Sequence, residues 1–340
     1  MIRKNTNWTA EPFLLKPAGK DYLWGGTRLN DDFRKDIPLS PLAETWECST
    51  HPDGLSLVAS GEHVGKTLKQ TLDEHPEYLG EHPSHPGGLP ILIKFIDAKE
   101  DLSIQVHPGD AYAAANENGS LGKTEMWYVL DAEEDTQISY GFSHDITREV
   151  LEKSLREGSV EKYLQKVQVK KDDVYFIQAG TVHGLGAGAL VAEIQECSNI
   201  TYRMYDHGRL DKDGKPRQLH IEKATDVADL SGNDKPRQPM RTLKYKKGSA
   251  LELLCRCKYF QVERMLLNTE HCREMVDYQT QENSFQVLLC LKGCGSFFME
   301  KGGYLNFFKG DCIFAPARSA PLKLHGRAQM LAVSCKKQID

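Results

Sequence analysis

Short apolar or alternating runs, each ended by Gly, Pro, Asn or Asp, are the feature that most limits what this chain can fold into. Alternation places successive side chains on opposite faces of a strand, and runs this short favour strands over helices. The runs recur at a spacing of roughly 8–15 residues with turn residues between them, which predicts antiparallel β-sandwich or barrel architecture. The predicted strands are Ile91–Ile96, Leu102–Val106, Met126–Leu130, Val174–Ile177, Leu190–Ile194, Thr201–Tyr205, Tyr259–Leu266, Phe285–Leu291, Ser296–Glu300, Tyr304–Phe308 and Gln329–Ser334.

Three segments depart from this pattern. Thr67–Glu74 and Thr147–Val167 carry apolar residues at helical spacing, and Gly158 is expected to split the second segment into two short helices. Ser231–Arg241 is polar, holds two prolines and a glycine and shows no periodicity, which predicts a linker. We therefore expect a larger N-terminal part and a C-terminal β-domain of roughly 100 residues, divided near residue 240.

The composition limits the partners of the protein. The 340 residues include 43 Lys and Arg against 48 Asp and Glu, a formal net charge of −5, with no long run of either sign. Nucleic acids and anionic membranes attract clustered basic residues, so neither is an expected partner. No stretch reaches the roughly 20 apolar residues of a membrane span. The first residues lack the apolar core of a signal peptide, which predicts a cytoplasmic location.

The nine cysteines are an odd number spread thinly along the chain. A disulfide framework would be denser and even-numbered, so reduced thiols are predicted. Cys255 with Cys257, and Cys290 with Cys294, leave a thiolate metal site as the alternative, although their spacing is not that of common zinc sites.

The strand around Ile104 carries an unusual polar face. Ser103, Gln105 and His107 alternate along it and therefore share one side. Facing the interior of a small barrel, three such residues would be costly to bury unless they bind something. The alternative is a strand with one face open to solvent.

Two further segments favour the binding interpretation. Lys123 and Glu125 share a face just before an apolar strand, and His183 follows another strand in a glycine-lined turn. Two imidazoles and a carboxylate, with an amide beside them, match the small ligand set of a catalytic zinc that keeps an open position.

Four ordered motifs resemble type I phosphomannose isomerases, in their short bacterial form. These motifs are Ser-Ile-Gln-Val-His-Pro-Gly-Asp at 103–110, Gly-Lys-Thr-Glu-Met-Trp at 122–127, Ala-Gly-Thr-Val-His at 179–183 and Thr-Tyr-Arg-Met-Tyr-Asp at 201–206. The resemblance extends to Trp24-Gly25-Gly26, Glu44-Thr45-Trp46-Glu47 and Lys94-Phe95-Ile96-Asp97. It implies a mainly β bicupin fold of two cupin-like jelly-roll β-barrels, with a small helical insertion at about 146–167. Residues 1–238 would be the catalytic cupin domain and 242–340 a C-terminal cupin-like domain.

The C-terminal domain is expected to hold no metal. Gly310-Asp311-Cys312-Ile313-Phe314-Ala315-Pro316 resembles the second cupin motif, but no pair of histidines precedes it, and His325 is interpreted as a structural residue.

The same resemblance assigns roles to residues of the N-terminal part. One Zn²⁺ per chain would be held by Gln105, His107, Glu125 and His183. The substrate phosphate would be held by Lys94, Ser103, Arg203 and Arg209, the last standing where many relatives carry lysine. The catalytic residues would be Arg203, Glu193 and Lys123; the proton carrier is left open between Glu193 and Lys123, with Glu193 preferred.

The activity implied by this resemblance is an aldose–ketose isomerisation between D-mannose 6-phosphate and D-fructose 6-phosphate through an enediol-type intermediate. A small-molecule sugar phosphate is then the expected partner, and the chain is expected to be a monomer or a homodimer. Two alternatives stay open, a metal-binding cupin of other activity such as an iron oxygenase, and a non-catalytic cupin that binds a sugar phosphate.

Overall fold

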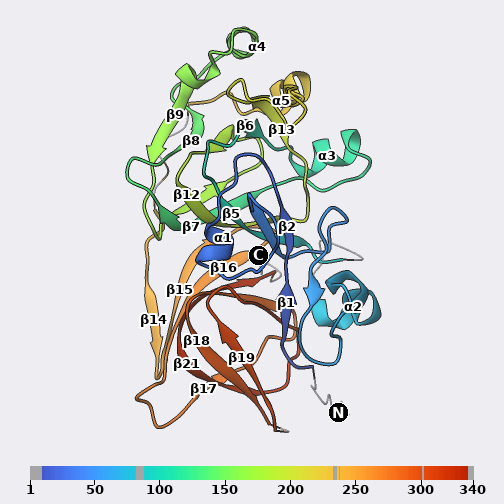
Figure 1. Cartoon of the computed structure of the whole chain (residues 1–340), viewed down its shortest axis with the longest axis vertical. Helices are drawn as coiled ribbons and strands as arrows, with labels where there is room; N and C mark the ends of the chain where they lie inside the picture. Colours follow the sequence, from blue (N-terminus) through green and yellow to red (C-terminus); the bar gives the residue numbers. More distant parts are fainter. Residues whose placement is uncertain (1–9, 82–87, 233–235, 237, 301, 336–340) are drawn as a thin grey trace, which may run out of the picture.

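The computed structural model describes residues 10–81, 88–232, 236, 238–300 and 302–335. Its strands form three sheets of ten, six and five strands, in which every pair of neighbouring strands is antiparallel. The sheets are stacked along the long axis of the molecule, and two short helices cover one end (Figure 1). The predicted mainly β class is therefore confirmed, while none of the three sheets closes on itself over the described residues.

The three sheets are called the large, the middle and the outer sheet. The large sheet contains β1 (Phe13–Lys16), β4 (Leu57–Val58), β14 (Leu243–Lys246), β15 (Ser249–Arg256), β16 (Gln261–Asn268), β17 (Val276–Tyr278), β18 (Gln286–Met299), β19 (Tyr304–Phe308), β20 (Cys312–Ala315) and β21 (Leu322–Ser334). The middle sheet contains β2 (Ala18–Lys20), β3 (Glu44–Cys48), β5 (Ile91–Asp97), β7 (Glu125–Ala132), β10 (Val174–Ile177) and β12 (Ala189–Glu196). The outer sheet contains β6 (Ile104–Val106), β8 (Gln137–Phe142), β9 (Leu164–Gln168), β11 (His183–Leu185) and β13 (Tyr202–Tyr205).

The chain begins in the sheet in which it ends. Strand β1 pairs with β20, and β4 pairs with β1, so two strands from the first 60 residues extend the large sheet (Figure 1). The division of the chain near residue 240 stays a prediction. The part of the predicted linker that the structure describes contains no strand or helix.

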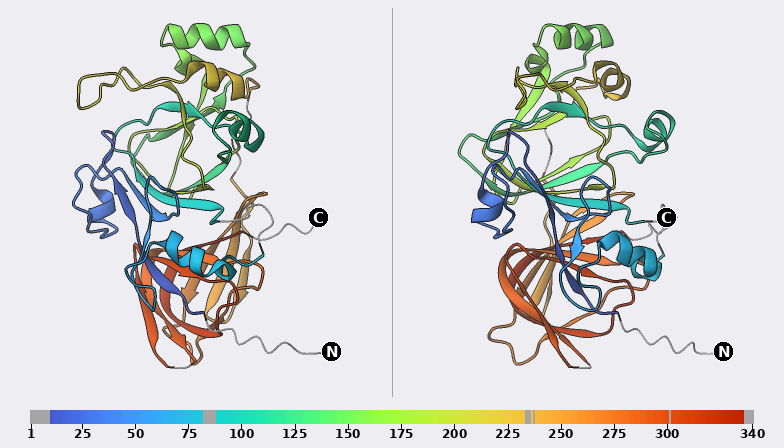
Figure 2. Two further views of the ribbon diagram at one scale, coloured as in Figure 1. Left: turned by 90° about the vertical axis from the view of Figure 1, so that its right-hand side faces the viewer. Right: turned by 45° about the vertical axis from the view of Figure 1, so that its right-hand side comes forward.

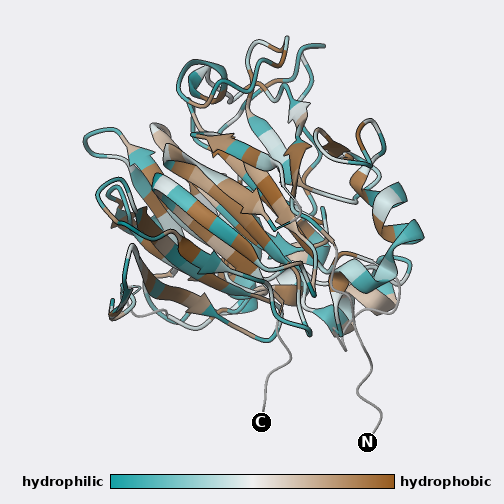
Figure 3. Cartoon of the chain, turned by 90° about the horizontal axis from the view of Figure 1, so that it is seen from below, coloured by the Kyte–Doolittle hydropathy of each residue, from teal (hydrophilic) through white to brown (hydrophobic). Residues whose placement is uncertain are grey.

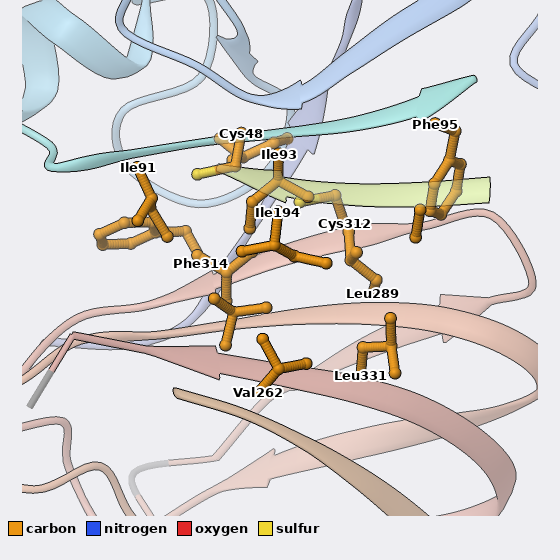
Figure 4. Packing of buried hydrophobic residues seen from close by; sticks show 14 of the residues in the cluster. Cys48, Ile91, Ile93, Phe95, Ile194, Val262, Leu289, Cys312, Phe314 and Leu331 are labelled. Carbon is orange, nitrogen blue, oxygen red and sulfur yellow. The ribbon is translucent and has the colours of Figure 1, made fainter. Parts of the chain in front are cut away.

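The main core lies between the middle and large sheets. Ile91, Ile93 and Phe95 of β5 point toward the large sheet, where Phe314 and Leu331 meet them (Figure 4). Because side chains alternate along a strand, the even-numbered residues of β5, including Lys94, face the opposite way, toward the outer sheet. The middle sheet thus separates an apolar interface from the space in which the predicted site residues lie.

Helices are few and short. The helical elements are α1 (Arg28–Asp31), α2 (Leu68–Glu74), η1 (Pro76–Leu79), α3 (Asp110–Asn116), α4 (Arg148–Arg156), η2 (Val160–Tyr163) and α5 (Ile221–Val227). Helices α4 and α5 cover the far side of the outer sheet (Figure 2), where Leu151 and Ala224 pack against Ile104 and Val106. None of the helices among the described residues is long and apolar enough to span a membrane.

The predicted helices are partly confirmed. Thr67–Glu74 corresponds to α2, whose Thr67 and Gln70 form a reciprocal capping box, and Gly158 adopts φ 64° between α4 and η2. The end of the predicted Thr147–Val167 helix is wrong, because Leu164–Gln168 forms β9 against β8. Burial in β9 alternates, and pairing with β8 outweighs the weak helical pattern.

In the C-terminal part, the predicted strand Tyr304–Phe308 is confirmed as β19, whereas other predicted strands are shorter than the observed ones. The two strands expected at Phe285–Leu291 and Ser296–Glu300 are one strand, β18, which pairs with β21 along its length despite a bulge between Cys290 and Lys292. Apolar residues gather on the strands of this sheet and hydrophilic ones on its loops (Figure 3). All nine cysteines are free thiols.

Candidate active site

Two rows of side chains from different sheets make the candidate site. In the outer sheet, β6 lies between β11 and β13, so Gln105 is in register with His183 on one side and with Arg203 on the other. In the middle sheet, Glu193 of β12 is in register with Lys94 of β5. Glu193 is also opposite Trp127 of β7, and Lys94 opposite Trp46 of β3. Antiparallel register thereby aligns residues that are distant in sequence.

A cavity of about 250 Å³ lies between these rows. It is lined by Tyr22, Trp24, Glu44, Lys94, Ile96, Leu102, Ser103, Gln105, Lys123, Glu193, Asn199, Thr201, Arg203 and Arg217. A larger cavity of about 330 Å³ adjoins the other side of Leu102, but none of the predicted site residues lines it. The smaller cavity, which is lined by predicted site residues, is therefore the candidate active site.

Three possible metal ligands meet beside this cavity. His107, Glu125 and His183 are buried, and their ligand atoms lie within 4.8 Å of one another. One Glu125 oxygen is 3.5 Å from His107 Nε2, and the other is 3.4 Å from His183 Nε2. Gln105 Nε2 lies 3.4 Å from His183 Nε2, and a half-turn of this amide exchanges its nitrogen and oxygen. The three clustered residues can hold a metal ion.

The imidazoles are oriented as metal ligands usually are. Nδ1 of His107 lies 2.9 Å from the carbonyl oxygen of Ile200, and Nδ1 of His183 lies 2.8 Å from that of Thr181. Each Nδ1–H donates to a carbonyl, so both Nε2 atoms are unprotonated acceptors on the side of Glu125. Burial lowers the pKa of His107 well below its usual value and that of His183 to about 4, so both rings are neutral at pH 7.

Glu125 carries the negative charge of the cluster. Its Oε1 atom is buried and has no hydrogen-bond partner. Burial, with repulsion from Glu193, raises the pKa of Glu125 to about 7. A buried carboxylate oxygen without a partner costs free energy. A cation placed between this oxygen and the two Nε2 atoms would remove that cost. The donor set and this orphaned oxygen fit a metal such as zinc.

Lys123 lies directly beside the possible ligands. Its Nζ donates to Glu125 Oε2 at 2.5 Å and lies 2.9 Å from His107 Nε2. The ammonium is almost completely buried. Lys123 therefore places a positive charge between the metal ligands and the cavity.

Glu193 and Lys94 form an ion pair on the opposite wall. Glu193 Oε1 is 3.1 Å from Lys94 Nζ, and Glu193 Oε2 accepts a hydrogen bond from Trp127 Nε1 at 3.0 Å. Burial alone would raise the pKa of Glu193, but the ammonium groups of Lys123 and Lys94 lower it to about 2. Burial alone would lower the pKa of Lys94, but Glu193 and Glu44 raise it. Both side chains are thus charged.

The two predicted arginines and a third one near them differ in their position relative to the cavity. Arg203 lines the cavity and donates from Nη1 to the Gln218 carbonyl at 2.9 Å. Arg209 is not among the lining residues, because its guanidinium bonds the Asp101 carbonyl and lies 3.6 Å from Asp206. Arg217 does line the cavity and is held by Asp206 through two bonds of 2.8 and 2.5 Å. Sequence reasoning did not find Arg217, which lies in a polar loop without periodicity.

The Trp24-Gly25-Gly26 segment closes one side of the cavity. A Cβ on Gly25 would lie 2.5 Å from the Ala43 backbone, and one on Gly26 would lie 2.2 Å from Asp97 Oδ2. Only glycine permits this approach, which lets Trp24 reach the cavity wall. The structure therefore gives these two glycines of the motif a packing reason.

Known proteins resemble this chain over most of its length. A family model for the phosphomannose isomerase type I catalytic domain matches residues 13–137. The mannose-6-phosphate isomerase ManA of Bacillus subtilis is 36% identical over 95% of this chain and 98% of its own length. The mannose-6-phosphate isomerase of Streptococcus mutans is 41% identical over 64% of this chain and 68% of its own length.

Structure comparison agrees with these sequence matches. The crystal structure of the mannose 6-phosphate isomerase from Bacillus subtilis superposes with a TM-score of 0.87 at 35% identity, over 95% of this chain and 99% of that chain. The motifs at 103–110, 122–127 and 201–206 supply residues to the cavity wall, and the motif at 179–183 supplies His183 to the cluster beside it. The chain belongs to the type I phosphomannose isomerase family.

Proposed function

We propose that this protein is a zinc-dependent mannose-6-phosphate isomerase, which interconverts D-mannose 6-phosphate and D-fructose 6-phosphate. The observation that carries the proposal is the meeting of His107, Glu125 and His183 beside a cavity with Lys94 and Arg203 in its wall, in a chain of this family. Two neutral imidazoles and a carboxylate suit a catalytic zinc, and the cations suit a phosphate dianion.

We assign the ligands and the phosphate contacts on the same basis. Gln105 would complete the metal set of His107, Glu125 and His183. When bound, zinc supplies Lewis-acid polarisation of a substrate carbonyl or hydroxyl oxygen.

The phosphate would be held by Lys94, Ser103 and Arg203 from the cavity wall. Arg209 would contribute to the same positive field, although its own bonds to Asp101 and Asp206 hold it behind the wall. Arg203 also faces the space beside the metal ligands and would stabilise oxyanion charge in the enediol-type intermediate.

Glu193 is the proposed proton carrier between C2 and C1. It is ionised at neutral pH and therefore already in the base form, whereas Lys123 would first have to lose its proton. A carboxylate with a pKa of about 2 is a weak base, but its low pKa depends on the ammonium groups of Lys123 and Lys94. A phosphate that engages Lys94 would weaken the Lys94–Glu193 pair and raise the basicity of Glu193. Binding of the remote phosphate would thus prepare the base.

The fold proposal follows the family. We propose that residues 1–238 and 242–340 are two cupin-like units of a bicupin, the first with a helical insertion that ends before β9 and the second without metal. The support is the antiparallel arrangement of all three sheets and the restriction of the buried His/Glu cluster to the N-terminal part.

A coupled assay with mannose 6-phosphate tests the proposed function. Activity should be present in the zinc-loaded protein, fall to background after chelation, and return with added zinc. An iron oxygenase would need Fe²⁺ and O₂ instead, and a silent sugar-phosphate binder would bind substrate with no turnover at any metal content. Either result would overturn the proposal.

A further inference from the structure

A second group of possible metal ligands lies among the described residues, on a different part of the chain. His63, Glu74 and His75 each offer a ligand atom, and these atoms lie within 4.8 Å of one another. The two imidazole rings have centroids 4.9 Å apart. None of these residues lines the cavity of the proposed isomerase site.

The backbone holds these residues in fixed places. Glu74 is the last residue of α2, and His75 is its C-cap. The capping box at Thr67 fixes the start of this helix. His63 lies in the turn between β4 and α2, and its buried ring is 3.3 Å from the Tyr78 hydroxyl. The His75 ring stacks on Tyr78 at 4.8 Å, so one aromatic side chain orients both imidazoles.

The local charge favours a cation. Glu62 Oε1 lies 3.1 Å from His63 Nε2, and Glu77 Oε1 lies 3.1 Å from His75 Nδ1. Together with Glu74 these are three carboxylates, against the single ammonium of Lys66, which is 2.6 Å from Glu74 Oε2. The carboxylates around the two imidazoles therefore outnumber the neighbouring ammonium group. The C-terminal end of α2 adds carbonyl dipoles of the same sign.

The carboxylates also match the surroundings of known metal-binding imidazoles. A ligating histidine usually has a carboxylate or carbonyl at its second nitrogen, which fixes the ring and strengthens the ligand. Glu77 supplies such a carboxylate to His75, and Glu62 adds an oxygen next to His63. Two imidazoles with one carboxylate are a donor set suited to zinc and, less selectively, to other late divalent transition metals.

We propose that His63, Glu74 and His75 form a second site for a divalent transition metal, with zinc as the fitting ion. The metal ties the turn that carries His63 to the end of α2. Glu62 and water complete its coordination. Glu74 can bind the metal through one oxygen while its other oxygen stays paired with Lys66. The following segment is fastened to the C-terminal part through the Tyr78 carbonyl, which accepts from Ala317 N at 2.8 Å. A metal here therefore braces the junction of α2 with the large sheet, and it takes no part in the isomerisation.

Zinc stoichiometry of the full chain tests the proposal. The variants are His75→Gln and Glu74→Gln, whose side chains are not buried, and the matched control is His271→Gln at an exposed histidine elsewhere. After equilibrium dialysis against zinc alone, wild type and His271→Gln should each bind one more zinc ion per chain than His75→Gln or Glu74→Gln. Equal zinc content in all four proteins, or the same loss in the His271 control, would overturn the second site.

Thermal unfolding supplies a readout that is independent of activity. Each protein is first loaded with one equivalent of zinc, so that the proposed active site is filled, and zinc is then added. A ligand that binds only the folded state raises the melting temperature. The rise should occur in wild type and His271→Gln and be absent in His75→Gln and Glu74→Gln, with isomerase activity equal in all four. A rise of the same size in the two cluster variants would refute the assignment, and their unchanged activity keeps this result separate from the proposed function.

Discussion

Two regions of the molecule are built from the same kind of antiparallel strand but contain different side chains. One is the space between the middle and outer sheets, and the other is the inner side of the large sheet. The large sheet encloses apolar side chains, among them Leu288, Phe297 and Met330. The space between the other two sheets contains buried Lys94, Glu125 and other charged groups. One architecture thus supports both a dry core and a charged site.

The difference shows what allows charged side chains to be buried between sheets. Burying a charge costs several kcal/mol unless it is paired and hydrogen-bonded. In the site, Lys94 pairs with Glu193 and Lys123 bonds Glu125, so these four buried charges lie in pairs of opposite sign. In the C-terminal part, His325 bonds Thr269 Oγ1 at 2.8 Å and belongs to no group of three possible metal ligands among the described residues. The comparison predicts that equivalent substitutions will have unequal effects in the two regions.

The largest effect is expected from the metal ligands. His107→Ala or His183→Ala should lose the zinc of the active site and reduce isomerase activity to background, because each variant leaves an incomplete coordination sphere there. His325→Ala, in the apolar region, should keep both. Metal analysis with the coupled assay measures the contrast, and full zinc content in the two N-terminal variants would remove these histidines from the ligand set.

Glu193→Gln should have the next largest effect. It should keep zinc and bind substrate while kcat falls by at least ~10²-fold, the usual scale for a positioned acid–base group. In the wild type, turnover in heavy water should place some solvent deuterium at C1 or C2 of the product. A near-normal rate for Glu193→Gln together with no deuterium in the product would favour a hydride shift or a base elsewhere.

The effects of the arginine variants on KM and kcat should depend on where each arginine lies relative to the cavity. Arg203→Ala should raise KM and also lower kcat, because we propose that Arg203, in the cavity wall, holds the phosphate and stabilises the oxyanion. Arg217→Ala should raise KM by about tenfold, the size of one lost charge-assisted hydrogen bond, with kcat retained. Arg209→Ala should raise KM by less, because Arg209 lies behind the wall. Steady-state kinetics with mannose 6-phosphate measures all three, and a larger KM change for Arg209 than for Arg217 would reverse this order.

Part of the site could be predicted from sequence because its residues lie on short strands or directly beside them. Alternation alone placed Ser103, Gln105 and His107 on one face, and the structure puts Ser103 and Gln105 in the cavity wall with the His107 cluster beside it. The apolar faces of the strands around Ile93 and Ile194 likewise follow from their pattern. These features depend on local periodicity, which a sequence displays directly.

Other features depend on contacts between distant segments. Arg217 reaches the cavity because Asp206 holds it, and no local pattern marks such a loop residue. The pairing of β1 with β20 joins residues about 300 positions apart and has no signature in either strand. The sequence predicts helix at β9 because its apolar residues fit a helical spacing, and its partner β8, at Gln137–Phe142, is not among the predicted strands.

The smallest expected effect concerns Glu196, a buried carboxyl at the boundary between the two regions. Its Oε2 accepts from Thr124 N at 2.7 Å. Nearby Asp110 bonds the Tyr259 hydroxyl at 2.8 Å and lies 3.1 Å from Lys258, both from the C-terminal part. Burial, with repulsion from Asp110, raises the pKa of Glu196 to about 8, so the folded protein holds a proton here that the unfolded chain releases near its usual value of 4.5.

The sign of the pH dependence follows from this proton. Between about pH 4.5 and 8 the folded state binds more protons than the unfolded state at Glu196, so this residue's contribution to the free energy of unfolding falls as pH rises. Glu196→Gln keeps an oxygen for Thr124 N and cannot ionise, and its stability in urea should therefore decline less from pH 5 to pH 8 than that of wild type. Tyr259→Phe is the matched control. It loses the bond to Asp110, whose pKa is lowered to about 2 and which stays ionised throughout this range, so its deficit should be the same at both pH values. Parallel curves for wild type and Glu196→Gln would mean that Glu196 is ionised in the folded protein and that the junction between the regions tolerates an unpaired charge.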